Sequence, residues 1–357
     1  MNDVTIYNCH VHLFTLDHVP TGFLGPKARM LLDDARKRGA LPALLRRILP
    51  DRDSDLFARY ARLAEVGLGT SEEAIFDRLA ASYPSGTRFV CLPLDMTFMG
   101  GGEPAKSVAD QHEGLLRLRD RHGDAIVPFI AVDPRRQHPG GLGAYVREHA
   151  ARGFRGIKIY PPLGVDPQDP RLVAEVYPVC VELGLPILTH CSRGGIRSRE
   201  LAPAAAQALA DPYRFRPVLE QFPTLRVCLA HFGGLADWRQ WVAIPKTIGN
   251  LHRLDDNWLQ RILEMLRSGR YPNLYTDISY TIFDFTTCAG PLKTFLQETA
   301  IRERVLFGSD YYMIEPERQA ERAIVTLLRA DFREGDLFRQ IAETNPRRYL
   351  GEPTPRP

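Results

Sequence analysis

Eight short apolar runs, each separated from the next by a helix-like segment, most constrain the fold of this 357-residue chain. The runs lie at 4–10, 88–96, 125–134, 156–160, 186–191, 226–232, 273–279 and 304–310. They are nearly continuous in apolar residues, as expected of parallel strands that are covered on both faces. Eight strands alternating with helices predict an α/β protein, a (β/α)8 barrel. The rival, a doubly wound open sheet, usually has fewer strands and often a glycine-rich first turn, which this sequence lacks.

The segments between the runs carry helix start and stop signals. In the stretch 70–83, Thr70 is followed three residues later by Glu73, which is the pattern of a capping box. In the stretch 169–185, Asp169 is suited to cap a helix that begins with Pro170 and ends near Gly184.

Two longer stretches interrupt the alternation. Residues 13–69 follow the first run and include a helix-like segment at 25–49, and residues 244–272 precede the seventh run. Loops that follow barrel strands lie on the catalytic face. We therefore expect a single domain over 1–357, with 13–69 as a helical insertion that covers the active site or makes a subunit contact.

Composition excludes several classes of protein. The formal net charge is only +3 and the arginines are spread along the chain, so nucleic-acid binding has little support. No apolar run is long enough to cross a membrane, and the N-terminus does not have the pattern of a signal peptide. The six cysteines form no Cys-X-X-Cys pair, which favours buried free thiols in a cytoplasmic protein.

His10 and His12 stand one residue apart in the first run. Residues two apart in a strand point to the same face, so the two imidazoles would project into one space. There they either hold a cation or repel each other when protonated. A pair with one ring facing solvent is the alternative.

Three more metal-competent residues, His190, His231 and Asp310, end the fifth, sixth and eighth runs. Barrel strands present catalytic residues at their C-terminal ends, so all five side chains converge on one rim. Three imidazoles and a carboxylate suit Zn²⁺ or another divalent first-row ion, with one position left for water. As alternatives, His190 could cap the core, His231 could only support Asp310, and Asp310 could cap the last helix.

The other histidines fall in loops or on polar helix faces, and we expect them at the surface: His18, His112, His122, His138, His149 and His252.

The chain resembles the amidohydrolase superfamily, in the branch that includes aminocarboxymuconate-semialdehyde decarboxylase. The matching motifs are "HVH" at 10–12, "GIKIYPP" at 156–162, "GLPILTHC" at 184–191, "LAHFGG" at 229–234, "LFGSDY" at 306–311 and "ETNPRRYLG" at 343–351. The resemblance implies one divalent metal ion, zinc or else manganese or another first-row ion. It also implies that His10, His12, His190 and Asp310 hold the ion, and that His231 acts beside it.

The resemblance leaves two reactions open. One is hydrolysis of a lactone, amide or related bond in a small carboxylate-bearing metabolite by a metal-activated water. Asp310 would move the proton, and His231 would stabilise the oxyanion or orient the water. The other is non-oxidative decarboxylation of an aromatic or unsaturated carboxylic acid. A barrel that binds metal without catalysis would leave the open coordination position unexplained. We expect a small-molecule substrate and no nucleic-acid or membrane partner, and the sequence leaves a homodimer open.

Lys158 and Arg193 are candidates for substrate binding. Lys158 lies within the fourth run, where a lysine needs a partner or loses its charge. It could bind a substrate carboxylate, form an internal ion pair, serve a structural role, or be carboxylated to bridge two metal ions, as in some superfamily members. Arg193 directly follows the fifth run and could grip a carboxylate or simply be solvated.

Overall fold

The computed structural model describes residues 4–20, 22, 66–67, 71–245, 252–314, 320–333 and 336–354. Its strands pair in parallel in two sheets, of order β1-β2-β3 and β4-β5-β6-β7-β8-β9. The strands are β1 (Tyr7–Val11), β2 (Arg88–Cys91), β3 (Ile126–Pro128), β4 (Ile130–Ala131), β5 (Ile157–Ile159), β6 (Ile187–Thr189), β7 (Val227–Leu229), β8 (Leu274–Asp277) and β9 (Val305–Leu306).

The two sheets are joined where β3 passes into β4. Only Phe129 separates these strands, and its backbone N–H donates to the carbonyl of Cys91 on β2 over 3.1 Å. The next residue, Ile130, donates to Gly156, just before β5, over 2.9 Å. The chain thus transfers its pairing from β2 to β5 within one run, which corresponds to the third predicted strand.

The ring closes between the last strand and the first. The N–H of Cys9 donates to the carbonyl of Phe307 over 2.9 Å, the N–H of Asp310 donates to the carbonyl of His10 over 2.8 Å, and a parallel bridge links Val11 to Tyr311. The eight predicted runs are all strands, and the (β/α)8 barrel is confirmed.

Apolar side chains fill both sides of this ring, which explains why the runs are continuous in apolar residues. A larger cluster lies between the strands and the helices. The smaller cluster contains residues on or next to the strands, together with two from the last helix: Tyr7, Cys9, Val90, Leu92, Val127, Phe129, Leu188, Cys228, Ala230, Tyr275, Leu306, Tyr349 and Leu350. All six cysteines are buried and free, as predicted.

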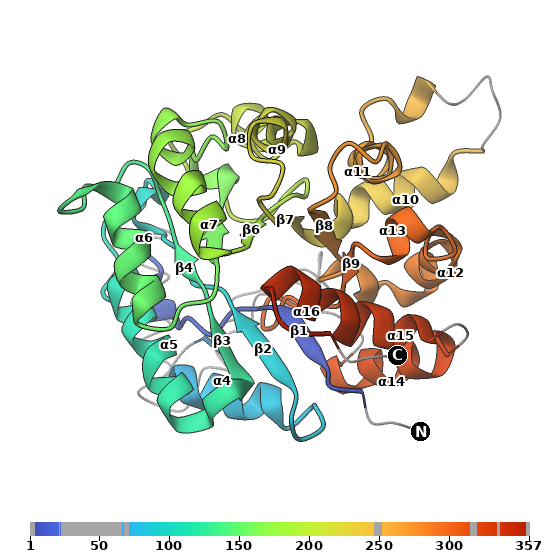
Figure 1. The fold of residues 1–357 in the computed structure, drawn as a ribbon, viewed down its shortest axis with the longest axis horizontal. Coiled ribbons are helices and arrows are strands. Elements are labelled where there is room, and N and C mark those ends of the chain that lie inside the picture. Colours follow the sequence, from blue (N-terminus) through green and yellow to red (C-terminus); the bar gives the residue numbers. More distant parts are fainter. Residues whose placement is uncertain are drawn as a thin grey trace, which may run out of the picture.

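Helices surround the strands (Figure 1). They are α4 (Glu72–Ala80), α5 (Val108–His122), α6 (Gly141–Ala151), α7 (Tyr177–Leu183), α8 (Pro203–Leu209), α9 (Arg216–Gln221), α10 (Leu235–Ala243), α11 (Trp258–Arg267), α12 (Phe285–Phe295), α13 (Thr299–Arg302), α14 (Glu321–Asp331), α15 (Leu337–Arg339) and α16 (Asn345–Leu350).

The predicted helix ends are confirmed in part. Helix α4 is capped by Ser71, whose side chain accepts from the N–H of Ala74 over 3.2 Å, so the cap at Thr70 is wrong by one residue. Before α7, the carboxylate of Asp169 accepts from the N–H of Arg171 over 2.8 Å, as predicted. The helix ends at Gly184 in the left-handed region, at a φ of 63°, where glycine has no steric penalty.

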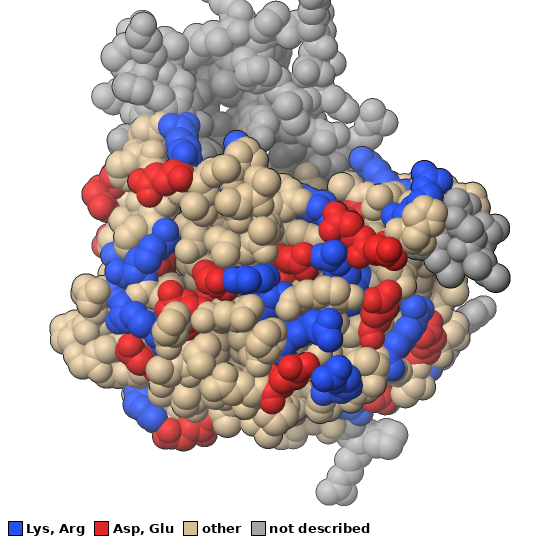
Figure 2. Space-filling model, turned by 90° about the horizontal axis from the view of Figure 1, so that it is seen from above, with Lys and Arg blue, Asp and Glu red and all other residues tan. Residues whose placement is uncertain are grey.

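The two long stretches are described unequally. Of the predicted insertion 13–69, only residues 13–20, 22 and 66–67 are described, and the segment 25–49 lies outside the described residues. In the second stretch, 244–272, helix α11 confirms the helical prediction. On the face in Figure 2, positive and negative side chains are interspersed.

Gly308 permits the close approach of β9 to β1. A Cβ at this position would lie 2.9 Å from Cβ of His10 and 3.3 Å from Cβ of Ser279. We predict that Gly308→Ala lowers the free energy of unfolding by about 1–3 kcal/mol, because β1 must move to admit the methyl group. Thermal and urea unfolding measure the change.

Gly290 in α12 is the matched control, since a Cβ there has no neighbour within 4 Å. Gly290→Ala is expected to stabilise by about 0.5–1 kcal/mol. Equal effects at the two glycines would show that the closure between β1 and β9 is not tightly packed.

Candidate metal centre

His10 and His12 face the same space, as predicted from their spacing. The pairing of β1 with β2 shifts register between Asn8 and Val11. Val11 packs in the outer cluster, while the two imidazole centroids lie 5.2 Å apart and both side chains are buried. This shift in register orients the two histidine side chains toward the C-terminal rim, and bulges commonly orient side chains beside active sites in this way.

Each of these rings is held through Nδ1. Nδ1 of His10 lies 3.0 Å from Oδ2 of Asp277, and Nδ1 of His12 lies 2.8 Å from the carbonyl oxygen of Leu92. The ionised carboxylate of Asp277 and the carbonyl oxygen of Leu92 can only accept hydrogen bonds. Each ring therefore donates from Nδ1. This tautomer leaves a lone pair on each Nε2, the form in which histidine binds metals.

Asp310 faces both lone pairs. Its Oδ1 lies 3.4 Å from Nε2 of His10 and 3.3 Å from Nε2 of His12. The ligand atoms of these three buried residues lie within 4.8 Å of one another, and Nε2 of His10 has no hydrogen-bond partner in the described part of the chain. Two Nε2 lone pairs and a carboxylate oxygen that lie this close together are suited to bind a cation between them.

His190 and His231 contact each other. Nδ1 of His190 lies 3.1 Å from Nε2 of His231, and Nε2 of His190 lies 3.1 Å from Oγ of Ser192. The ring of Tyr160 stacks on His190 at a centroid distance of 4.6 Å. The ring of His231 lies 4.9 Å from that of His10. Among the described residues, His190 is not part of a three-ligand group, so its role as fourth ligand stays a prediction.

Asp277 and Ser279 connect the two pairs of histidines, and the sequence analysis missed both. Oδ1 of Asp277 accepts from the backbone N–H groups of His231 and Ser279 over 2.9 and 3.0 Å, and from the hydroxyl of Ser279. Oγ of Ser279 lies 3.1 Å from Nδ1 of His10 and 2.9 Å from Nδ1 of His231. The sequence did contain a signal for Asp277: it lies near the C-terminal end of the seventh run, as Asp310 does in the eighth run.

Burial keeps the imidazoles neutral. It lowers the pKa of His10 and His231 well below the usual value and that of His190 to about 3, and the nearby Lys158 ammonium lowers all three further. Burial also raises the pKa of Asp310. The histidines are therefore in the state that ligates metals or donates and accepts hydrogen bonds.

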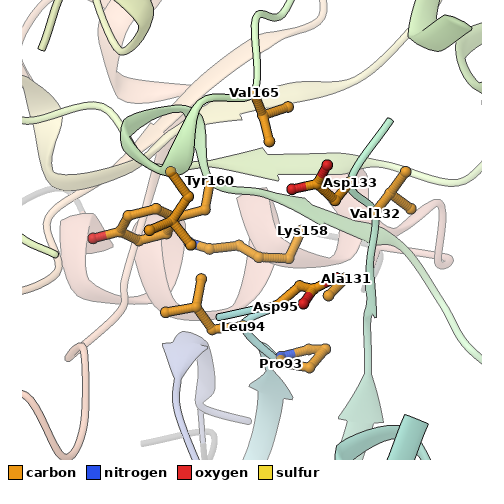
Figure 3. A pocket seen from close by; sticks show the side chains of 10 residues that line it. Pro93, Leu94, Asp95, Ala131, Val132, Asp133, Lys158, Tyr160 and Val165 are labelled. Carbon is orange, nitrogen blue, oxygen red and sulfur yellow. The ribbon is translucent and has the colours of Figure 1, made fainter. Parts of the chain in front are cut away.

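Lys158 points into the barrel mouth and is only 2% exposed. Its Nζ has no hydrogen-bond partner and no carboxylate within 4.0 Å among the described residues, so the predicted internal ion pair is not found there. The ring of Tyr160 has its centroid 5.7 Å from Nζ, and both side chains line the same pocket (Figure 3). Burial lowers the pKa of Lys158 to about 8.

Arg193 is bound by other side chains of the same rim. Its guanidinium lies 3.1 Å from Oδ2 of Asp237 and 2.8 Å from Oδ2 of Asp256, and 4.7 Å above the ring of Trp258. These contacts tie the loop after β6 to α10 and α11. A role for Arg193 in substrate binding stays a prediction.

The prediction that the six remaining histidines lie at the surface was wrong for three of them. His18, His112 and His149 are buried, whereas His122 and His138 are half-buried and His252 is exposed. Nδ1 of His18 accepts from the N–H of Thr15 over 3.0 Å, and Nε2 of His112 accepts from the N–H of Ala131 over 3.0 Å. These rings satisfy backbone groups inside the protein, which polar flanking sequence does not reveal.

A family model described as an amidohydrolase matches residues 7–351, nearly the whole chain. The chain belongs to the amidohydrolase family. It is therefore an enzyme of a metal-dependent family, in agreement with the candidate ligands at the barrel rim. No curated protein matches the sequence. Among the described residues, no helix is both long and apolar enough to cross a membrane.

Solved structures of the same fold include enzymes of two reaction types. A 5-carboxyvanillate decarboxylase from Sphingomonas paucimobilis is 13% identical, with a TM-score of 0.57 over 98% of this chain and 100% of that one. A probable 2-pyrone-4,6-dicarboxylic acid hydrolase from Acinetobacter baumannii, with citric acid bound, is 12% identical, with a TM-score of 0.56 over 97% and 99%.

A third structure is that of a 5-carboxyvanillate decarboxylase from Novosphingobium aromaticivorans in complex with manganese and 4-hydroxy-3-methoxy-5-nitrobenzoic acid. It is 16% identical, with a TM-score of 0.54 over 98% of this chain and 96% of that one. At these identities the likeness concerns the fold.

The buried ammonium of Lys158 gives a prediction for stability. Because burial lowers its pKa from 10.5 to about 8, the unfolded chain binds a proton between these pH values that the folded protein has released. The burial cost is thus fully present below pH 8 and is relieved as the pH rises to 10.5. We predict that Lys158→Met is more stable than wild type at pH 7 by up to about 3 kcal/mol.

Urea unfolding at several pH values checks this difference, which is expected to shrink between pH 8 and 10.5. Lys293→Met is the matched control, because Lys293 is partly exposed and pairs with Asp331. A difference for Lys158→Met that stays constant with pH would contradict the prediction.

Proposed function

We propose that the protein is a metal-dependent hydrolase acting on a small carboxylate-bearing metabolite, such as a lactone or an amide. The observation that carries the proposal is the convergence of three acceptor atoms, Nε2 of His10, Nε2 of His12 and Oδ1 of Asp310, in a buried site. Because Asp277 and Leu92 occupy Nδ1 of the two rings, no ring proton lies between these atoms.

The residues fit one divalent ion, with zinc as the first candidate and manganese or another first-row ion as alternatives. His10, His12 and Asp310 would hold it, and His190 is proposed as the fourth ligand. Two imidazoles and a carboxylate are typical ligands of catalytic zinc, and neutral rings are the ligating form. When bound, such an ion supplies an activated water and polarises a carbonyl group.

Asp310 and His231 are the proposed catalytic residues. Burial raises the pKa of Asp310, which suits a carboxylate that takes a proton from the attacking water and returns it to the leaving group. His231 is neutral, and because the hydroxyl of Ser279 donates to Asp277, Nδ1 of His231 donates to Oγ of Ser279. Nε2 of His231 therefore accepts a hydrogen bond, which suits a group that orients the attacking water. Asp277 and Ser279 fix the position of its ring and backbone.

Non-oxidative decarboxylation is the second candidate, because enzymes of both types share this fold. We predict that a panel of lactones, amides and aromatic carboxylic acids contains substrates that are hydrolysed without release of CO₂. Product analysis together with CO₂ detection checks this. Turnover of a carboxylic acid with one CO₂ released per product would refute the hydrolase and favour the decarboxylase.

The ligand set predicts the effect of His12→Ala. We expect wild type to hold about one divalent ion per chain and His12→Ala to lose it while keeping its fold, because the ring is at the rim and outside the apolar core. Elemental analysis and far-UV circular dichroism measure the two properties. A folded His12→Ala protein with full metal content would contradict this ligand set.

His231→Asn separates one metal ion from two. With a single ion, the variant is expected to keep its metal and lose about 10²–10⁴-fold in turnover, the usual contribution of an acid–base group. With two ions bridged by a carboxylated Lys158, wild type would contain two equivalents and the variant about one. Metal content of both proteins, measured beside turnover, decides between these arrangements.

A further inference from the structure

A pocket at the C-terminal ends of β2, β4 and β5 surrounds the buried side chain of Lys158 (Figure 3). The pocket has a volume of about 10 Å³, which is room for one small group. We propose that it is a subsite in which Nζ of Lys158 binds a carboxylate group of the substrate, while the adjoining carbon skeleton stays outside the pocket. The proposal rests on the proposed function. The pocket is lined by Pro93, Leu94, Asp95, Ala131, Val132, Asp133, Lys158, Tyr160, Leu163 and Val165.

The two carboxylates that line the pocket are already paired. Oδ1 of Asp95 accepts from Nη2 of Arg136 over 2.8 Å, and its Oδ2 accepts from Nε of the same arginine. Oδ1 and Oδ2 of Asp133 accept from Nε and Nη2 of Arg135 over 2.9 and 2.5 Å. Each acidic residue is thus paired with an arginine, so among the described residues neither carboxylate of the pocket pairs with the ammonium of Lys158.

The carboxylates deeper in the barrel are committed elsewhere. Asp277 accepts hydrogen bonds from His10, His231 and Ser279, and Asp310 faces His10 and His12. Neither lies within 4.0 Å of Nζ of Lys158. A buried ammonium without a hydrogen-bond acceptor is costly to the fold, so its presence is explained by an acceptor that arrives with the ligand.

The walls of the pocket indicate what carries the carboxylate. Leu94, Val132, Leu163 and Val165 offer apolar surface, and Tyr160 also lines the pocket. Its ring is 5.7 Å from Nζ of Lys158 and stacks on His190. A carboxylate at Lys158 therefore places the neighbouring carbon atoms along Tyr160 toward the histidines. The expected ligand is a carboxylic acid with a flat or apolar skeleton.

Calorimetric binding of isophthalate tests the subsite, with its uncharged diamide as the comparison ligand. Wild type is expected to bind isophthalate, and Lys158→Met to bind it about 10- to 100-fold more weakly, the range for a hydrogen bond to a charged group. Binding of the diamide is expected to be equal in both proteins. Lys293→Met, which removes a surface lysine, is expected to bind isophthalate like wild type.

Metal content separates this proposal from the proposed function. Lys158→Met is expected to retain the metal of wild type, and the titrations are run on metal-loaded and metal-free protein. A chain that binds no metal overturns the proposed function, whereas the isophthalate titration of metal-free protein still tests Lys158. Equal isophthalate affinity in wild type and Lys158→Met, or no binding to wild type, overturns the subsite.

Two further measurements cover misfolding and a modified lysine. If Lys158→Met fails to fold, Lys158→Gln replaces it and is expected to show the same selective loss of isophthalate binding. Wild type exposed to ¹³C-bicarbonate is expected to show no carbamate signal by NMR. A carbamate signal that scales with protein concentration overturns the proposal, because a carboxylated Lys158 is anionic and repels a carboxylate.

Discussion

The buried carboxylate of Asp277 holds the two halves of the candidate centre in register. It receives Nδ1–H of His10 from β1, the backbone N–H of His231 after β7, and both donors of Ser279 after β8. A fully buried anion is tolerated only when several donors satisfy its oxygens, and these donors do so. The same bonds fix which nitrogen of His10 carries the proton, and that choice directs the lone pair toward Asp310.

Local backbone strain accompanies this arrangement. His231, Tyr280 and Asp310 all have positive φ, at 67°, 58° and 68°, although none is glycine. Such conformations cost of order 1–3 kcal/mol each and persist where surrounding bonds hold them. Here the bonds are those of Asp277 to His231 and of His10 to the N–H of Asp310. The strands thus end abruptly at these residues, and the side chains of His231 and Asp310 lie beside His10.

The order of strands and the placement of His10, His12 and Asp310 could be predicted because periodicity and chain order are local properties of the sequence. The role of Asp277 could not, since it depends on which donors meet it from three different strands. For the same reason, polar neighbours in the sequence misplaced His112, whose ring accepts a hydrogen bond from β4 inside the protein. That Nζ of Lys158 meets no hydrogen-bond acceptor in the described part of the chain likewise depends on side chains distant in sequence.

Charge balance links the metal centre to the pocket of Lys158. His10, His190 and His231 are neutral, so the carboxylates of Asp277 and Asp310 and the ammonium of Lys158 together leave one excess negative charge in the barrel mouth. A divalent cation reverses this excess to one positive charge, at a site where burial makes uncompensated charge expensive. A singly charged carboxylate then brings the region to neutrality. In the proposed complex, the metal and the anionic ligand would therefore favour each other's binding, and Lys158 would determine on which side of the barrel mouth the carboxylate lies.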